Sequence, residues 1–322
     1  MMPGFLRCLV LLLAVTVSLP AKAYPDRPIS LVVGWAAGGS TDVIARLIAV
    51  RLSDKLGQQV IVVNKPGASG TIGAQFVANE KPDGYTLYYG TNSTYALAPW
   101  LYGSLPYDFD KAFEEVSFVG SMPMILGVRL QLPAKTLPEL IDQARAKPRG
   151  LTFGSSSAGS TSHIAAELLM WQAGIELTHV PYRGGGPALA ALLSGEIDIL
   201  FNDIATLEPM MKSQRVRGLA STTSRRLAEM PDLPTVAEAG LQGFEVATTN
   251  AVFVPRGTPA AVISRLHDAL KAVLAEPALA KELALRGMIV QPSTPQDLAS
   301  HVRQEQAKWR SLLQARGITL NP

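Results

Sequence analysis

Trp35-Ala36-Ala37-Gly38-Gly39-Ser40-Thr41-Asp42 is the stretch that decides the fold, because it stands between a strand pattern and a helix pattern. The apolar run 29–33 before it is rich in strand-forming residues. After it, apolar residues recur at helical spacing from Val43 to Leu56. Two adjacent glycines leave the backbone free to turn sharply between the two patterns. The stretch therefore predicts a strand-to-helix turn.

The polar residues at the start of this helix can either cap the helix or bind a ligand. Ser40 or Thr41 is expected to cap the helix, and Asp42 in its first turn complements the helix dipole. The N–H groups exposed at such a start also favour an anion. Any helix start has the same hydrogen-bonding needs. Taken alone, the turn therefore indicates an ordinary strand–helix unit.

The first 23 residues have the pattern of a secretory signal peptide. Arg7 supplies the positive charge, residues 9–19 are mostly apolar, and Ala21-Lys22-Ala23 is a small-x-small cleavage site. The apolar run is too short to span a membrane. We expect cleavage before Tyr24 and a soluble mature protein in the periplasm.

The composition of the mature chain narrows its class. Cys8, the single cysteine, lies in the predicted signal peptide, so the exported protein depends on a large core instead of disulfides. Loss of Arg7 and Lys22 lowers the basic count from 29 to 27, against 26 acidic residues. A charge near zero argues against nucleic acid as a partner.

Strand and helix patterns alternate along most of the mature chain, which predicts parallel sheets covered by helices. The fold class is therefore α/β. Residues 99–117 are expected to be irregular, and two apolar stretches interrupt the alternation. The predicted parts are lobe 1, residues 24–120 plus 250–322; lobe 2, residues 125–243; and two hinge crossovers, residues 118–128 and 244–254.

Nucleotide, metal and cofactor motifs are missing from the sequence. Gly67-x-x-Gly70-x-x-Gly73 follows a strand pattern, but its spacing differs from the GxGxxG dinucleotide fingerprint. No Gly-Lys pair occurs, which excludes a P-loop. The four histidines have no ligand-like spacing. We therefore expect no cofactor and no metal.

A hydrolase is the main catalytic alternative. Residues 154–159 resemble the G-x-S-x-G nucleophile elbow, yet both Ser156 and Ser157 miss the pattern by one position. His163 and Asp203 could complete a triad on paper. His163 belongs to the same turn and helix as Ser156, however, so it would struggle to reach the serine. We therefore predict no catalytic residues.

Polar residues follow at least five predicted strands, at 38–42, 67–71, 91–93, 154–162 and 202–203. Ligands of open α/β sheets bind outside the carboxyl ends of the strands. These strand ends are divided between both predicted lobes, which indicates a binding protein with a cleft of neutral donors. The predicted ligand-binding residues are Trp35, Gly38, Gly39, Ser40, Ser69, Ser93, Ser156, Ser160, Thr161 and Asp203.

Several longer motifs resemble those of the solute receptors of tripartite tricarboxylate transporters, also called Bug receptors. The resemblance covers essentially all of residues 24–320. Its motifs are Gly38-Gly39-Ser40-Thr41-Asp42 with Arg46, Asn64-Lys65-Pro66-Gly67-Ala68-x-Gly70-x-Ile72-Gly73, Lys81-Pro82-Asp83-Gly84-Tyr85, Leu105-Pro106-Tyr107-Asp108, His179-Val180-Pro181-Tyr182-Arg183-Gly184-Gly185, Asp232-Leu233-Pro234-Thr235-Val236-Ala237-Glu238-Ala239-Gly240 and Pro255-x-Gly257-Thr258-Pro259.

The resemblance implies a two-lobed periplasmic binding protein of the Venus-flytrap kind, type II-like, which delivers a small carboxylate solute to membrane permease subunits. It implies main-chain amides and ordered waters around one carboxylate at the first strand–helix turns. The other end of the solute would meet residues 154–162 and Asp203. Gly34-Trp35 and Asn202-Asp203 depart from the usual family pattern. We expect a monomer; a periplasmic serine hydrolase and a sensor for a signalling partner remain alternatives.

Overall fold

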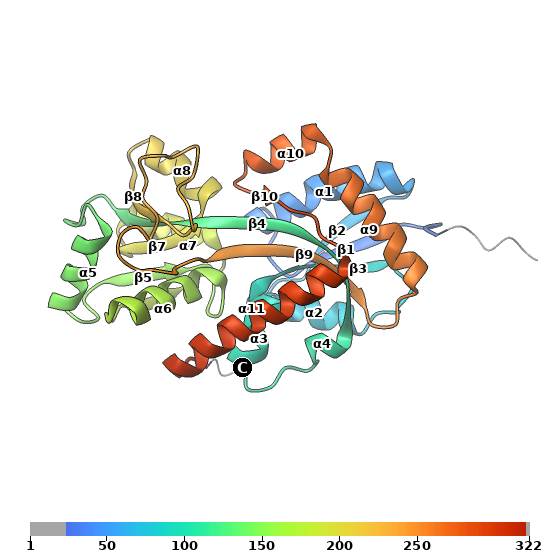
Figure 1. The fold of residues 1–322 in the computed structure, drawn as a ribbon, viewed down its shortest axis with the longest axis horizontal. Helices are drawn as coiled ribbons and strands as arrows, with labels where there is room; N and C mark the ends of the chain where they lie inside the picture. The colour runs from blue at the N-terminus through green and yellow to red at the C-terminus, as the bar shows by residue number, and fades with distance from the viewer. Residues whose placement is uncertain (1–23, 320–322) are drawn as a thin grey trace, which may run out of the picture.

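The computed structural model describes residues 24–319, so the predicted signal peptide lies outside the described residues. Strands and helices alternate as expected over most of this range (Figure 1). The strands are β1 Ile29–Val33, β2 Val60–Asn64, β3 Thr86–Thr91, β4 Phe113–Arg129, β5 Thr152–Ser155, β6 Thr178–Pro181, β7 Ile199–Asp203, β8 Val216–Ser221, β9 Ala247–Pro255 and β10 Ile289–Val290. The helices are α1 Ser40–Leu56, η1 Ala68–Gly70, α2 Thr71–Ala78, η2 Ser93–Leu97, α3 Ala98–Leu101, α4 Phe109–Ala112, α5 Leu137–Ala146, α6 Thr161–Ala173, α7 Gly185–Ser194, α8 Ile204–Lys212, α9 Ala260–Leu274, α10 Pro277–Ala284 and α11 Pro295–Arg316.

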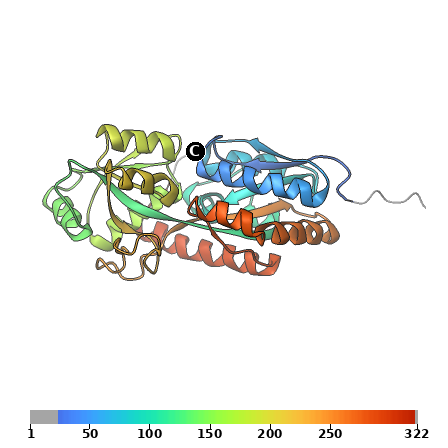
Figure 2. The same ribbon diagram turned by 90° about the horizontal axis from the view of Figure 1, so that it is seen from above.

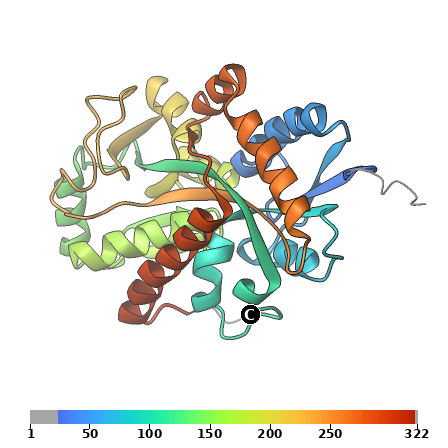
Figure 3. The same cartoon turned by 45° about the vertical axis from the view of Figure 1, so that its right-hand side comes forward.

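The strands form two lobes that share a pair of long strands. The main path of the sheet has the order β2-β1-β3-β9-β4-β7-β5-β6, and β8 and β10 pair with β4 beside it. In the first lobe β1 pairs in parallel with β2 and β3; in the second, β5 pairs in parallel with β6 and β7. Helices cover both faces of each lobe (Figures 1 and 3).

The two long strands β4 and β9 connect the lobes. The first part of β4 pairs with β9, and the part after Pro123 pairs with β7 and β8. We expected residues 99–117 to be irregular, but β4 already begins at Phe113. Pro123 lies where β4 changes partner, and a missing N–H is tolerated where a ladder is interrupted. The strand therefore continues through the proline.

Hydrophobic packing differs between the two sides of the molecule. Separate clusters lie under α1 with α9 in one lobe and under α7 with α8 in the other. On the opposite face, one cluster runs through both lobes, from Tyr88 and Trp309 to Phe153 and Leu168. The long helix α11 covers this continuous core and crosses toward α6 (Figure 3). The lobes are thus joined on the α11 side.

The turn that opens the sequence forms the expected strand–helix connection, but its cap differs from the prediction. Helix α1 starts at Ser40, and Gly39 is the residue at its N-cap, with no side-chain hydrogen bond. Neither Ser40 nor Thr41 caps the helix. The helix start is therefore open on the side where Ser40 and Thr41 lie.

The glycines of the second turn have a packing role. A Cβ on Gly34 would lie 2.6 Å from the Cα of Gly70, and one on Gly73 would lie 2.9 Å from the Cα of Gly34. Both distances are shorter than any real carbon contact. Gly70 also has a φ of 90°, which favours glycine. The spacing Gly67-x-x-Gly70-x-x-Gly73 thus lets two turns pack backbone against backbone.

Helix α8 was not expected from the sequence. It carries Pro209 in its interior, and it starts directly after β7 without an intervening loop. As a result, Asp203 ends a strand and precedes a helix at the same time. None of the described helices is long and apolar enough to cross a membrane.

Candidate functional site

A cavity of about 770 Å³ lies between the two lobes. The starts of four helices contribute to its walls: α1 from the first lobe and α6, α7 and α8 from the second. In Figure 2 the blue helix α1 and the yellow-green helices of the other lobe lie opposite each other. The starts of helices carry partial positive charge and free N–H groups, so the cavity favours an anion.

All ten predicted ligand-binding residues line this one cavity. Whether they bind a solute stays a prediction. Other residues line the cavity without being among the predicted ligand-binding residues, although some of them lie in the polar stretches 154–162 and 202–203. These are Met124, Ser157, Ser162, Tyr182, Arg183, Asn202, Thr206 and Thr248 among others.

Hydroxyl groups hold the two lobes together across the cavity. Among the described residues, three hydrogen bonds join side chains that line the cavity from opposite lobes: Ser40 Oγ with Asp203 Oδ2 at 2.7 Å, Ser69 Oγ with Ser157 Oγ at 3.0 Å, and Ser93 Oγ with Thr161 Oγ1 at 3.1 Å. The Ser69 hydroxyl also donates to the carbonyl of Ala158 at 2.7 Å. Because each of these bonds joins the two lobes, the structure has a closed cleft.

Trp35 both packs and lines the cavity. The ring is partly buried against the apolar cluster of the first lobe. Its Nε1–H donates to Thr91 Oγ1 at 3.2 Å. The indole is therefore held in one place at the cavity wall, where it contributes to the core and to the pocket at once.

Asp42 serves the start of α1, as its position in the first turn indicated. Its carboxylate accepts the N–H of Gly38 at 2.8 Å, the Arg46 guanidinium at 2.9 Å and the Asn64 amide at 2.8 Å. Burial acts to raise the pKa of Asp42, but these donors outweigh burial and hold the pKa below its usual value. Asp42 is therefore a buried carboxylate, and both of its oxygens accept hydrogen bonds from donors of the first lobe.

Asp203 lies across the cavity in a different environment. Only Oδ2 has a partner, the Ser40 hydroxyl; Oδ1 is buried and has no hydrogen bond from the described residues. Burial raises the pKa of Asp203 to about 6, although the hydroxyls of Ser40 and Thr248 oppose the rise. The Thr248 hydroxyl is near the carboxylate without reaching hydrogen-bond geometry.

Ser160 uses its hydroxyl for the fold. It is the N-cap of α6: its Oγ accepts the His163 N–H and donates to the Ser157 carbonyl at 2.7 Å. The side chain is almost fully buried. Ser160 therefore lines the cavity while its hydroxyl is engaged by the loop that carries it.

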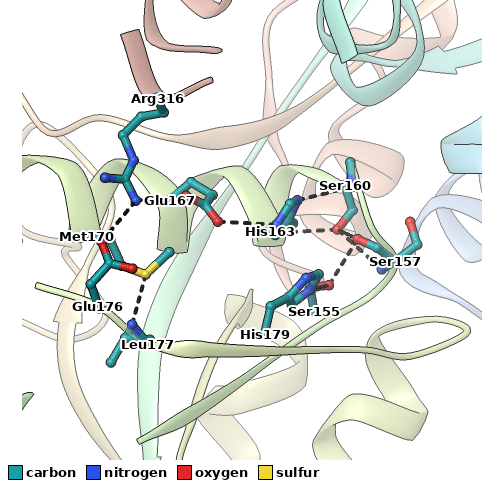
Figure 4. Close-up of polar contacts among 11 residues, drawn as sticks. Ser155, Ser157, Ser160, His163, Glu167, Met170, Glu176, Leu177, His179 and Arg316 are labelled. Atoms are coloured by element: carbon teal, nitrogen blue, oxygen red, sulfur yellow. Dashed lines mark hydrogen bonds and ion pairs between the residues drawn. The ribbon is translucent and has the colours of Figure 1, made fainter. Parts of the chain in front are cut away.

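Two stacked histidines support this loop from behind (Figure 4). The rings of His163 and His179 lie 4.1 Å apart. His163 Nδ1 accepts the N–H of Gly159, and His179 Nε2 lies 2.7 Å from Ser155 Oγ. Burial and the neighbouring His163 lower the pKa of His179 to about 3. The two histidines therefore fix the loop that precedes α6, and Glu167 contacts His163 Nε2 at 3.5 Å.

The arrangement does not assemble the hydrolase considered from the sequence. Ser156 Oγ pairs with Ser162 Oγ, and Ser157 Oγ pairs with Ser69 Oγ. His163 turns away from both serines toward Gly159 and Glu167. The described residues also hold no group of three or more histidines, cysteines or acids able to bind a metal.

Arg183 is the cation that the sequence analysis overlooked. It lies in the loop before α7, its side chain is exposed, and it lines the cavity. None of the described residues forms an ion pair with it. Sequence reasoning placed it in a family motif and gave it no role, because a single exposed arginine is common.

Solved structures with the same architecture define the class of this protein: a two-lobed periplasmic solute-binding protein. Rpa4515 of R. palustris, solved with adipate, is 36% identical, covers 93% of this chain and 100% of its own, and has a TM-score of 0.88. MatC of Rhodopseudomonas palustris, solved with malate, is 34% identical, covers 90% of this chain and 100% of its own, and has a TM-score of 0.84. The periplasmic binding protein BugD is 32% identical over 93% and 100%, with a TM-score of 0.85.

The chain belongs to the tripartite tricarboxylate transporter receptor family, whose sequence model matches residues 44–318. A UPF0065 protein of Bordetella bronchiseptica is 38% identical over 98% of this chain and 94% of its own. BugT of Bordetella pertussis is 33% identical over 93% and 92%. The resemblance drawn from the sequence motifs is confirmed.

Proposed function

We propose that this protein is an extracytoplasmic receptor that binds a small carboxylate solute between its lobes and delivers it to a tripartite tricarboxylate-type permease. The observation that carries the proposal is the cavity of about 770 Å³, to whose walls four helix starts contribute. Relatives solved with adipate and malate support a carboxylate as the ligand.

The chemistry of binding follows from the start of α1. The N–H groups of Ser40 and Thr41 have no acceptor within the helix, and Gly39 brings no side chain between them and the cavity. A carboxylate at this point would accept these N–H groups and interact with the positive helix end. Binding therefore needs no catalytic group and no cofactor.

Closure of the lobes would couple binding to delivery. β4 and β9 cross between the lobes and are the proposed hinges, at residues 118–128 and 244–254. The continuous core beneath α11 restrains motion on that side, so we expect opening on the side of α1, α7 and α8. A solute that touches both lobes stabilises the closed state, because only differential affinity shifts such an equilibrium.

The location and partner follow from the family and the N-terminus. We propose export through the signal peptide at residues 1–23, cleavage before Tyr24, and action as a monomer beside membrane permease subunits. N-terminal sequencing of the exported protein tests the cleavage. A chain that stays uncleaved in the membrane contradicts it.

A thermal-shift panel of mono-, di- and tricarboxylates, amino acids and aromatic acids tests the function. The expected result is a saturable rise in melting temperature with at least one unmodified carboxylate. Small-angle scattering with that solute should show a smaller radius of gyration than the solute-free protein. Failure of every carboxylate to bind contradicts the proposal, and turnover of an ester would favour an enzyme instead.

A further inference from the structure

The unsatisfied oxygen of Asp203 is the feature of the cavity that the binding of a plain carboxylate leaves unexplained. Asp203 is more than nine-tenths buried and lines the cavity. Its Oδ1 has no hydrogen-bond donor among the described residues. A buried carboxylate oxygen without a donor is costly, and groups of this kind gather at binding sites.

The position of Asp203 relative to α1 limits what can stand between them. Ser40 is the first residue of α1, and its Oγ lies 2.7 Å from Asp203 Oδ2. A solute carboxylate held by the N–H groups of Ser40 and Thr41 is therefore close to the Asp203 carboxylate. Two such charges repel unless a donor stands between them.

We propose that Asp203 Oδ1 accepts a hydrogen bond from the solute, and that the site selects α-hydroxy or α-amino acids over plain carboxylates. This inference rests on the proposed function. The donor belongs on the carbon next to the bound carboxylate, because the helix start and Asp203 are joined through one serine. A hydroxyl or ammonium at that carbon satisfies Oδ1 and separates the two negative charges.

The other charged groups near the cavity do not supply the hydrogen-bond donor that Asp203 Oδ1 lacks. Arg183 lines the cavity from the loop before α7 without a hydrogen bond to Asp203. Asp42 on α1 is fully paired, Tyr182 donates to Glu196, and Glu208 on α8 pairs with Lys212. β4 contributes Met124 opposite Asp203, and β9 contributes Thr248. Arg183 remains available for a second carboxylate.

Four solutes that differ in few atoms test this proposal by calorimetry on the mature protein near pH 7.5. Succinate and adipate have no donor, whereas L-malate and L-aspartate add a hydroxyl or an ammonium to the succinate chain. We expect L-malate or L-aspartate to bind at least about tenfold more tightly than succinate and adipate, the scale of one buried unsatisfied acceptor. Equal or tighter binding of succinate or adipate overturns the inference.

Two variants locate the effect. Asp203→Asn should reduce the donor preference to less than about threefold, whereas Asp42→Asn should leave it intact, since its carboxylate is already satisfied. An unchanged preference in Asp203→Asn overturns the assignment. If that variant does not fold, the wild-type comparison of L-malate and L-aspartate with succinate at pH 7.5 decides alone. If only plain carboxylates bind, this inference is wrong and the proposed receptor function is unaffected. If no carboxylate binds, both the inference and the proposed function are wrong.

Discussion

Asp42 and Asp203 are both buried aspartates at helix starts, but only Asp203 lines the cavity, and the hydrogen-bond donors around the two carboxylates differ. Asp42 stands at α1 with donors from Gly38, Arg46 and Asn64. Asp203 stands before α8, and its carboxylate has one donor among the described residues, the Ser40 hydroxyl of the other lobe. The Asp42 carboxylate receives all of its hydrogen bonds from its own lobe. The Asp203 carboxylate keeps one oxygen without a donor among the described residues, and the proposed recognition of the solute by Asp203 rests on this difference.

The largest expected effect is at the glycine that opens the α1 side. Gly39→Val should lower solute affinity at least about a hundredfold, because the new side chain covers the N–H groups that a carboxylate would reach. Its backbone φ of −73° suits valine, so the fold should survive. Gly103→Val, in open space on the surface, is the matched control and should bind normally. Normal binding by Gly39→Val would place the carboxylate elsewhere.

Asp203→Asn should make the solute-free protein more stable near pH 7.5. The folded pKa of about 6 exceeds the reference value of 3.8, so the charged form opposes folding above pH 6. Removing the charge should raise the free energy of unfolding by roughly 1–3 kcal/mol. The gain should fade between pH 6 and pH 4, where the folded wild type takes up a proton. Urea unfolding at several pH values measures it; a loss of stability at pH 7.5 would contradict this account.

Asp42→Asn should act in the opposite direction. Its pKa is lowered in the fold, so its charge stabilises the protein above the reference pKa, and this contribution is lost as the pH falls through the folded value. We expect the free energy of unfolding to fall by roughly 1–2 kcal/mol at neutral pH. Solute affinity should change less than about tenfold. A hundredfold loss of affinity at unchanged stability would show that Asp42 contacts the solute.

The smallest expected effect is at Ser160. Since its hydroxyl caps α6, Ser160→Ala should lower the free energy of unfolding by about 1 kcal/mol. Ser156→Ala is the comparison and should lose less, because the Ser156 hydroxyl pairs only with Ser162 among the residues that the structure describes. Parallel unfolding curves of both variants measure the difference. Equal losses would show that the cap contributes little.

The sequence was sufficient to predict the cavity wall, the family, the two-lobed fold and the structural role of Asp42. Polar residues after strands predicted the cavity wall, since parallel strands place their carboxyl ends at one edge. The motif resemblance predicted the family and the two-lobed fold. Asp42 at a helix start indicated a structural acid, and its three donors agree with that.

What the sequence could not predict depends on contacts between distant segments. The bond from Ser40 to Asp203 joins residues 163 positions apart. Local patterns favour Ser40 as a helix cap, whereas the structure places Ser40 inside the helix with its hydroxyl bonded to Asp203. The missing donor at Asp203 and the continuous β4 through Pro123 likewise depend on which strands and lobes meet. That Arg183 lines the cavity likewise follows only from the fold.

The most direct measurement is the titration of the two aspartates by carboxyl NMR, assigned with the two asparagine variants. We predict that Asp203 titrates near pH 6 in the solute-free protein and Asp42 below its reference value. A solute with an α-ammonium or α-hydroxyl should move the Asp203 midpoint downward and leave Asp42 unchanged. Two aspartates that both titrate below pH 4 without solute, or an Asp203 midpoint that rises on binding such a solute, would contradict the account.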